Sequence, residues 1–351
     1  MTVGDETQPG NADSGRHGGT GGLSAAELIA RARSAAPAAP SAPTRASRHS
    51  RAEAPIRHLS AVQVSTDTER LPDIEQSGLL APEKKSGAGR NLPMAILVGV
   101  GLAGIIVASL YTYRPSFVIV VALASVIGVY ELVTAISTVE ARPPLVLLVV
   151  EALAIDVAAW FRGPDGLVGA LLLSIIGVAI WRLGDGATGY LRDVAAGVFV
   201  AVYLPFLAGF AILLAHAEDG APRVVLFVAA VVCSDTGGYA AGVLLGRHPM
   251  APTISPKKSW EGFLGSVIAC CVCGALVMEL TFHQQWWQGL VFGLAIAVTA
   301  TLGDLGESMI KRDLGLKDMG KLLPGHGGVM DRLDSLLPCA AVAYLLLSVF
   351  A

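Results

Sequence analysis

From residue 92 onward the sequence is a succession of apolar runs, most of them long enough to cross a membrane. A bilayer core is roughly 30 Å thick and a helix rises about 1.5 Å per residue, so about 20 apolar residues span it. Nine such runs occur, at 92–111, 116–138, 144–161, 167–182, 194–215, 224–246, 262–281, 287–303 and 335–350. None alternates as a barrel strand does. The sequence therefore predicts an all-α, polytopic membrane bundle of about nine transmembrane helices, with eight or ten as alternatives.

The composition fits a membrane protein. Hydrophobic residues make up 53% of the chain and charged residues 15%, whereas an ordinary globular chain carries about 25% charged residues. A net charge of −3 gives no general attraction to nucleic acid, so we expect no nucleic-acid partner. The five cysteines all lie in apolar runs, which argues against a disulfide framework or a zinc site.

Residues 1–90 differ sharply from the rest of the chain. They are rich in Gly, Ala, Ser and Pro, and no stretch among them could bury enough apolar surface to offset its ordering entropy. No apolar run follows the first methionine, so a secretory signal is not expected. We predict a disordered cytosolic tail over 1–90 and a transmembrane domain over 91–351.

The basic residues indicate the orientation in the membrane. With the N-terminus in the cytosol, fourteen of the lysines and arginines from Lys84 onward lie in the cytosolic segments or at the span ends next to them, and three face away. Cytosolic loops carry such an excess of basic residues. The two longest connections, 247–261 and 304–334, are then both cytosolic. We predict a multi-pass protein of the cell (plasma or inner) membrane with its active site on the cytosolic face.

The connection 304–334 concentrates reactive side chains. If the preceding helix continues past residue 303, one of its faces carries Asp304, Glu307, Ser308 and Lys311. Asp331 and Asp334 stand one turn apart at the start of the last helix. Four acids brought together would repel unless a cation lay between them, and oxygen-only ligands favour Mg²⁺ over zinc. The alternative is a solvated charged loop that only fixes the topology.

The same connection resembles the signature of a known family. Residues 308–334 are similar at all 27 positions to phosphatidate cytidylyltransferases (CDP-diacylglycerol synthases): Ser-x-apolar-Lys-Arg, Lys-Asp-x-small, Pro-x-His-Gly-Gly and Asp-Arg-x-Asp. The segments 303–308, 234–239 and 255–262 also fit the family. The resemblance covers roughly residues 95–351.

The resemblance implies transfer of the cytidylyl group of CTP to phosphatidate, with release of pyrophosphate, in the lipid bilayer. It implies a Mg²⁺ centre, leaves a second cation open, and implies metal ligation by Asp304, Glu307, Asp331 and Asp334. Catalytic roles are implied for Asp304, Lys311, Asp331 and Asp334. Substrate contacts are implied for Asp235, Ser255, Lys257, Lys258, Ser259, Glu261, Ser308, Arg312, Lys317, His326, Gly327, Gly328 and Arg332. The oligomeric state, a homodimer included, stays open.

Two other functions remain to be distinguished. Acids within the apolar runs, such as Glu131 and Glu151, suit an ion-coupled transporter, but no motif surrounds them, and a local hydrogen-bonding role is the preferred interpretation. A CTP-using polyprenol kinase would share CTP and Mg²⁺ but transfer the γ-phosphoryl group to an alcohol.

Overall fold

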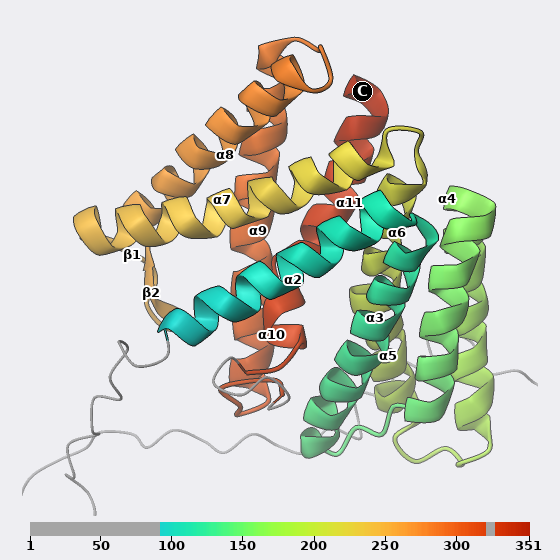
Figure 1. The fold of residues 1–351 in the computed structure, drawn as a ribbon. Coiled ribbons are helices and arrows are strands. Elements are labelled where there is room, and N and C mark those ends of the chain that lie inside the picture. The colour runs from blue at the N-terminus through green and yellow to red at the C-terminus, as the bar shows by residue number, and fades with distance from the viewer. Residues whose placement is uncertain (1–91, 321–326) are drawn as a thin grey trace, which may run out of the picture. The chain divides into compact units, whose positions relative to one another are not determined.

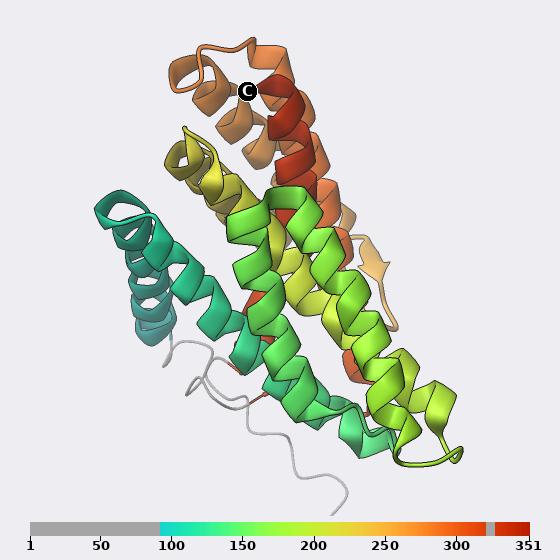
Figure 2. The same cartoon turned by 90° about the vertical axis from the view of Figure 1, so that its right-hand side faces the viewer.

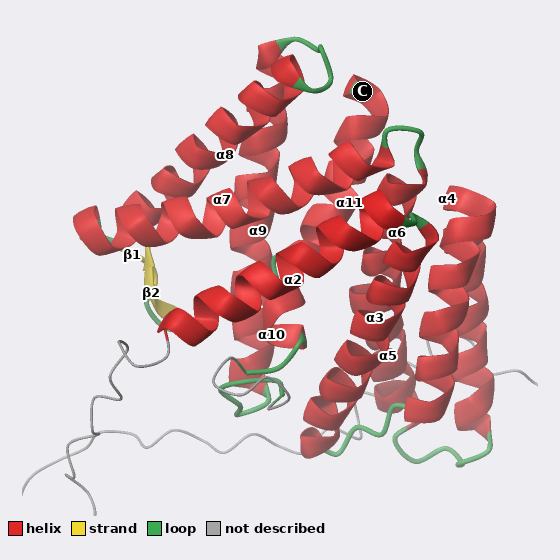
Figure 3. Ribbon diagram, viewed as in Figure 1, coloured by secondary structure: helices red, strands yellow, loops and turns green. Residues whose placement is uncertain are grey.

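The computed structural model describes residues 92–320 and 327–351, and these are almost entirely helical (Figures 1 and 3). The predicted tail and His326 lie outside the described residues. The longer helices are α2 (Leu92–Thr112), α3 (Pro115–Ile136), α4 (Leu145–Leu183), α5 (Tyr190–Ala201), α6 (Leu207–His216), α7 (Gly220–Leu245), α8 (Trp260–Leu280), α9 (Trp286–Asp313) and α11 (Leu336–Phe350). Short elements are η2 (Ser137–Val139), η3 (Val202–Phe206), α10 (Met330–Leu333) and the strands β1 (Pro249–Ala251) and β2 (Ser255–Ser259).

Seven helical segments of the described chain are long and apolar enough to cross a membrane. Large apolar side chains lie exposed on their outer surfaces, for example Phe161 at 76% and Leu173 at 70%. Apolar surface on this scale is typical of a protein that contacts lipid. The prediction of a polytopic helical membrane protein is confirmed in this form, whereas the count of about nine helices is not.

The count differs by two, because α2 falls short of the required length in the described residues and because α4 joins two of the predicted runs. This element has 39 residues, which at about 1.5 Å per residue is nearly twice the thickness of a bilayer core. Gly163 (φ 63°, ψ −147°) breaks its helical geometry just before Pro164. The two halves then run back side by side, and Gly177 in the second half faces the side chain of Glu151 in the first (Figure 2). The runs 144–161 and 167–182 thus form one bent element.

The C-terminal helices pack closely through small residues. Gly237 on α7 faces Gly265 on α8, and Gly274 on α8 faces Gly289 on α9, so that a Cβ at any of these positions would overlap the neighbouring backbone. Small residues let membrane helices approach in this way. The β1–β2 hairpin between α7 and α8 lies beside the C-terminal part of α9, where Lys258 contacts Asp304.

Three of the connections that are predicted to be cytosolic lie at one end of the bundle. The connections α3–α4 and α4–α5 lie at the same end as the loop after α9, and the C-terminus of α11 lies at the opposite end (Figure 1). At that first end Asp193 accepts hydrogen bonds from the backbone N–H of Arg142 (2.9 Å) and from the Arg182 guanidinium (2.5 Å), which ties the two connections together.

Candidate active site

The β1–β2 hairpin and helix α9 meet through an ion pair. The strands are antiparallel, and β2 presents Lys258 to α9. Its Nζ donates to Asp304 Oδ2 at 2.8 Å and to the carbonyl oxygen of Thr301 at 3.3 Å. Lys258 and Asp304 are 46 positions apart and belong to two separate segments of the predicted signature. The structure therefore brings these two segments into direct contact.

A second lysine links α9 to α10. Lys311 forms an ion pair with Glu307 one turn earlier on α9, and its Nζ lies 3.0 Å from Asp331 Oδ1. All three side chains are largely withdrawn from solvent, with exposed fractions of 16%, 1% and 8%. A buried carboxylate without a partner is costly, so Lys311 offsets the charge of both acids.

Asp331 also organises the backbone around it. Its carboxylate accepts the N–H of Gly328 at 2.7 Å and the N–H of Met319 at 3.1 Å. Gly327, which has φ 79°, provides the tight turn that precedes these contacts. Asp331 thus holds two points of the loop that joins α9 to α10, one at Met319 and one at Gly328.

Asp304 and Asp334 are brought together by a glycine. A Cβ at Gly303 would lie 2.6 Å from the carbonyl oxygen of Asp334 and 3.3 Å from Cα of Ser335, so only glycine allows this approach. Asp334 Oδ1 accepts the N–H of Ser335 at 2.7 Å. Asp304, which follows Gly303, and Asp334, which follows α10, therefore lie on adjoining backbone.

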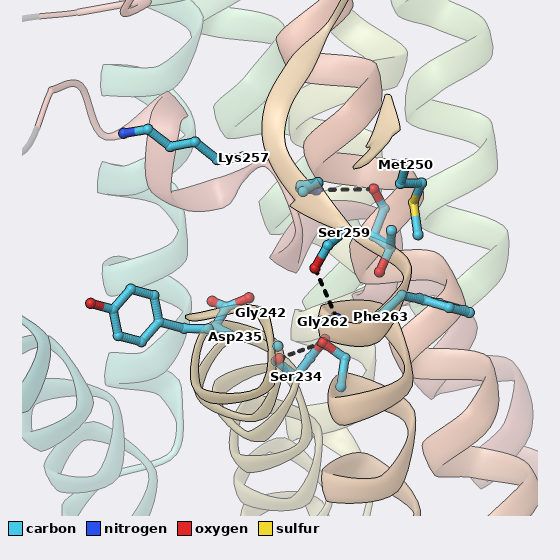
Figure 4. A pocket seen from close by; sticks show the side chains of 13 residues that line it. Ser234, Asp235, Gly242, Met250, Lys257, Ser259, Gly262 and Phe263 are labelled. Carbon is cyan, nitrogen blue, oxygen red and sulfur yellow. Dashed lines mark hydrogen bonds between the residues drawn. The ribbon is translucent and has the colours of Figure 1, made fainter. Parts of the chain in front are cut away.

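A cavity of about 180 Å³ opens between α7, the hairpin and α8. Asp235 of α7 lines it from one side and Ser259 from the other (Figure 4). Tyr239 and Lys258 also line it. Lys257 also lines it, although its side chain extends away from Ser259 (Figure 4). The cavity combines a carboxylate, hydroxyls and ammonium groups, a lining suited to a polar, anionic ligand.

Two residues predicted to contact substrate also have clear local roles. Ser259 is the N-cap of α8 and accepts the N–H of Gly262 at 3.1 Å. Glu261 accepts the N–H groups of Arg247 (3.1 Å) and His248 (3.2 Å), and its Oε1 lies 2.6 Å from Nδ1 of the His248 ring. Both contacts hold the hairpin against the start of α8. Their predicted substrate contacts stay predictions.

The remaining predicted residues surround this group. Ser308 is half-buried on α9, Ser255 is half-buried on β2, and Gly328 is buried beside Asp331. Arg312, Lys317 and Arg332 are exposed, as is Lys257 of the cavity. Such positions on the rim suit contact with phosphates.

Carboxylate oxygens are suitable ligands for a hard divalent cation. Among the described residues, however, no three His, Cys, Asp or Glu side chains lie together at metal-binding distance. Lys311 lies between Glu307 and Asp331, and Lys258 lies against Asp304. Both oxygens of Glu307 are buried; Oε2 contacts the Lys311 ammonium, and Oε1 takes no hydrogen bond from the described residues. An all-carboxylate donor set with a free buried oxygen fits Mg²⁺. The metal centre therefore stays a prediction.

One residue near the site could not be assigned from the sequence. Glu131 of α3 contacts the loop between α9 and α10 at the N–H of Met330, 199 positions away. The signal available in the sequence was an acid within an apolar run, which is expensive in a membrane. That signal identifies an unusual residue but not its partner.

Comparison with known proteins gives a consistent result. The sequence model of the Cytidylyltransferase family matches residues 93–350. The chain is 40% identical over 301 residues to the phosphatidate cytidylyltransferase of Mycobacterium leprae, an alignment that covers 80% of this chain and 95% of the relative. It is 42% identical over 281 residues to that of Mycobacterium bovis (75% and 90%), and 39% identical over 179 residues to that of Brucella suis (51% and 63%).

Proposed function

The chain belongs to the cytidylyltransferase family, and we propose that it transfers the cytidylyl group of CTP to phosphatidate, giving CDP-diacylglycerol and pyrophosphate. Relatives with this activity in their names align with most of the chain. The single structural observation that carries the proposal is the contact of Lys258 with Asp304. It joins an anion-binding cavity to a cluster of acids, the two features that a reaction between polyanions requires.

The reaction needs charge control more than a strong base. An anionic phosphate oxygen of phosphatidate bonds to the α-phosphorus of CTP, and the bond from this phosphorus to the oxygen bridging to the β-phosphorus breaks. Pyrophosphate leaves with the bonding electron pair. Because the nucleophile is already ionised, the protein contributes chiefly positioning and electrostatic stabilisation.

We assign the residues by their surroundings. Lys258 and Lys311 offset the phosphate charges, and Asp235 lines the cavity that receives the polar substrate. Asp304 and Asp334, which adjoin through Gly303, form the core of the magnesium site, with Glu307 and Asp331 completing it. A divalent cation held there supplies neutralisation of the phosphates and of the departing pyrophosphate.

The membrane arrangement follows from the same proposal. We infer nine spans, with the two halves of α4 and helix α2 each crossing the bilayer, and an N-terminus in the cytosol of the cell membrane. Phosphatidate then lies with its head group at the cytosolic interface, and CTP arrives from water on that side. An active site at the cytosolic end of α9 meets both substrates.

A labelling experiment tests the reaction. The full-length purified protein is incubated with phosphatidate vesicles, Mg²⁺ and CTP labelled at either the α or the γ phosphate. We expect the α label in the lipid fraction and the γ label in pyrophosphate, and no lipid label when phosphatidate is left out. Incorporation of the γ label into lipid would indicate a lipid kinase. Incorporation of neither label would contradict both the cytidylyltransferase and the kinase.

A further inference from the structure

Glu131 is a buried acid that reaches the active-site loop from a different helix. It lies on α3, and its exposed fraction is 4%. Its Oε2 accepts the N–H of Met330 at 2.9 Å, and its Oε1 takes no hydrogen bond from the described residues. Met330 precedes Asp331 directly, so this contact is made one residue away from a central acid of the site.

The loop backbone encloses the Glu131 carboxylate from two sides. A Cβ at Gly320 or at Gly328 would overlap the carboxylate, so both glycines pass in direct contact with it. Asp331 accepts the N–H of Gly328 and that of Met319, the neighbour of Gly320. Glu131 and Asp331 therefore contact the same two backbone segments, residues 319–320 and 328–330. Glu131 does so from α3, and Asp331 does so from α10.

The burial of the Glu131 carboxylate indicates that this side chain has a specific role. A carboxylate in a membrane-spanning helix carries a large desolvation cost, and such residues commonly have a functional role. Glu151 on α4 is a useful comparison, because it is also buried at 8% exposed, while its neighbour Gly177 belongs to the second half of the same element. Of these two acids, only Glu131 contacts the loop.

We propose that Glu131 is a positioning residue for the cytidylyl transfer: its carboxylate fixes the backbone at residues 320, 328 and 330 and thereby places the Asp331 side chain. This inference rests on the proposed function. Glu131 need not touch substrate. Its contribution is the acceptor oxygen offered to Met330, and a neutral amide oxygen at the same position supplies the same contact.

Substitutions at Glu131 separate positioning from general destabilisation. Glu131→Ala removes the acceptor and leaves a buried N–H unsatisfied, so we expect kcat to fall about 10- to 100-fold with little change in KM for CTP. Glu131→Gln keeps an acceptor oxygen and should retain kcat within several-fold. Glu151→Ala removes an equally buried acid and should leave kcat unchanged. Folding is checked by gel filtration and thermal melting in detergent.

A loop variant provides an independent test. Gly320→Ala places a methyl group against the Glu131 carboxylate and should lower kcat in the otherwise normal protein. In a Glu131→Ala background the obstruction is gone, so the same substitution should have little further effect. The control is Gly169→Ala on α4, where a Cβ meets no atom within 4 Å.

The outcomes distinguish this proposal from the one on which it rests. If the unmodified protein forms no CDP-diacylglycerol, the proposed function fails. If it does form the product and Glu131→Ala has the same kcat, the positioning role is refuted. Unchanged kcat in Gly320→Ala refutes it as well, even if Glu131→Ala does not fold. Equal losses in Glu131→Ala and Glu151→Ala would assign the effect to burial alone.

Discussion

Replacing Lys311 with methionine tests the charge balance of the site. Its ammonium is the partner of both Glu307 and Asp331, whose side chains are 1% and 8% exposed. Removal of one member of a buried pair costs about 3–5 kcal/mol because a charge is left uncompensated. Lys311 itself is 16% exposed, which admits some water, so we take the lower end, about 3 kcal/mol. Over the roughly 260 residues of the membrane domain, at about 2.1 cal/mol/K per residue, that corresponds to a fall of about 5 °C in melting temperature.

The assay combines thermal melting in detergent with the α-label transfer assay. We expect Lys311→Met to melt lower and to lose activity by orders of magnitude at a temperature where it is folded. Adding Glu307→Gln removes one of the two uncompensated charges and should recover part of the stability but not the activity. Arg162→Met, which removes an exposed cation at the other end of the bundle, is the control. A normal melting temperature and normal transfer in Lys311→Met would refute the reasoning.

Three further predictions concern the tail, the topology and the metal. Deletion of residues 1–80 should leave membrane insertion and transfer nearly unchanged, and an inserted but inactive truncation would contradict this. In a cysteine-free background, single cysteines at Thr253 and Glu218 should react with a membrane-impermeant thiol reagent from opposite sides; reaction from one side would overturn the orientation. Asp331→Asn removes one negative charge but keeps the size of the side chain, so transfer should fall by orders of magnitude. Excess Mg²⁺ should restore at most part of the activity. Near-normal transfer at limiting Mg²⁺ would exclude Asp331 from the site.

Hydropathy predicted most of the fold because lipid imposes a simple rule. Every backbone group in the bilayer must bond within its own helix, so apolar length and helical span coincide. The rule does not determine how consecutive spans are joined. Between 161 and 167 the chain needs only Gly163 in a non-helical conformation and Pro164 to reverse direction, and the result is one bent element rather than two separated by a loop.

Some contacts among the candidate site residues could be predicted from the sequence, and others could not. Spacing on α9 places Glu307 and Lys311 on one helical face, and the structure has them as an ion pair. The contact of Lys258 with Asp304 depends on the close packing of α7, α8 and α9, which no local pattern encodes. The contact of Glu131 with Met330 likewise depends on the packing of the first spans against the last one.

The charge balance of this group suggests why lysines and acids are paired in it. When all are ionised, Asp304, Glu307, Asp331 and Asp334 carry four negative charges, and Lys258 and Lys311, which contact three of these acids, offset two of them. The remaining two negative charges equal the charge of one divalent cation. Ammonium groups attract phosphates as well as carboxylates, so arrival of CTP gives both lysines a second anionic partner. We propose that one or two of the acids released in this way would hold Mg²⁺ together with the phosphates of the nucleotide and water, which would couple binding of the nucleotide to completion of the metal site.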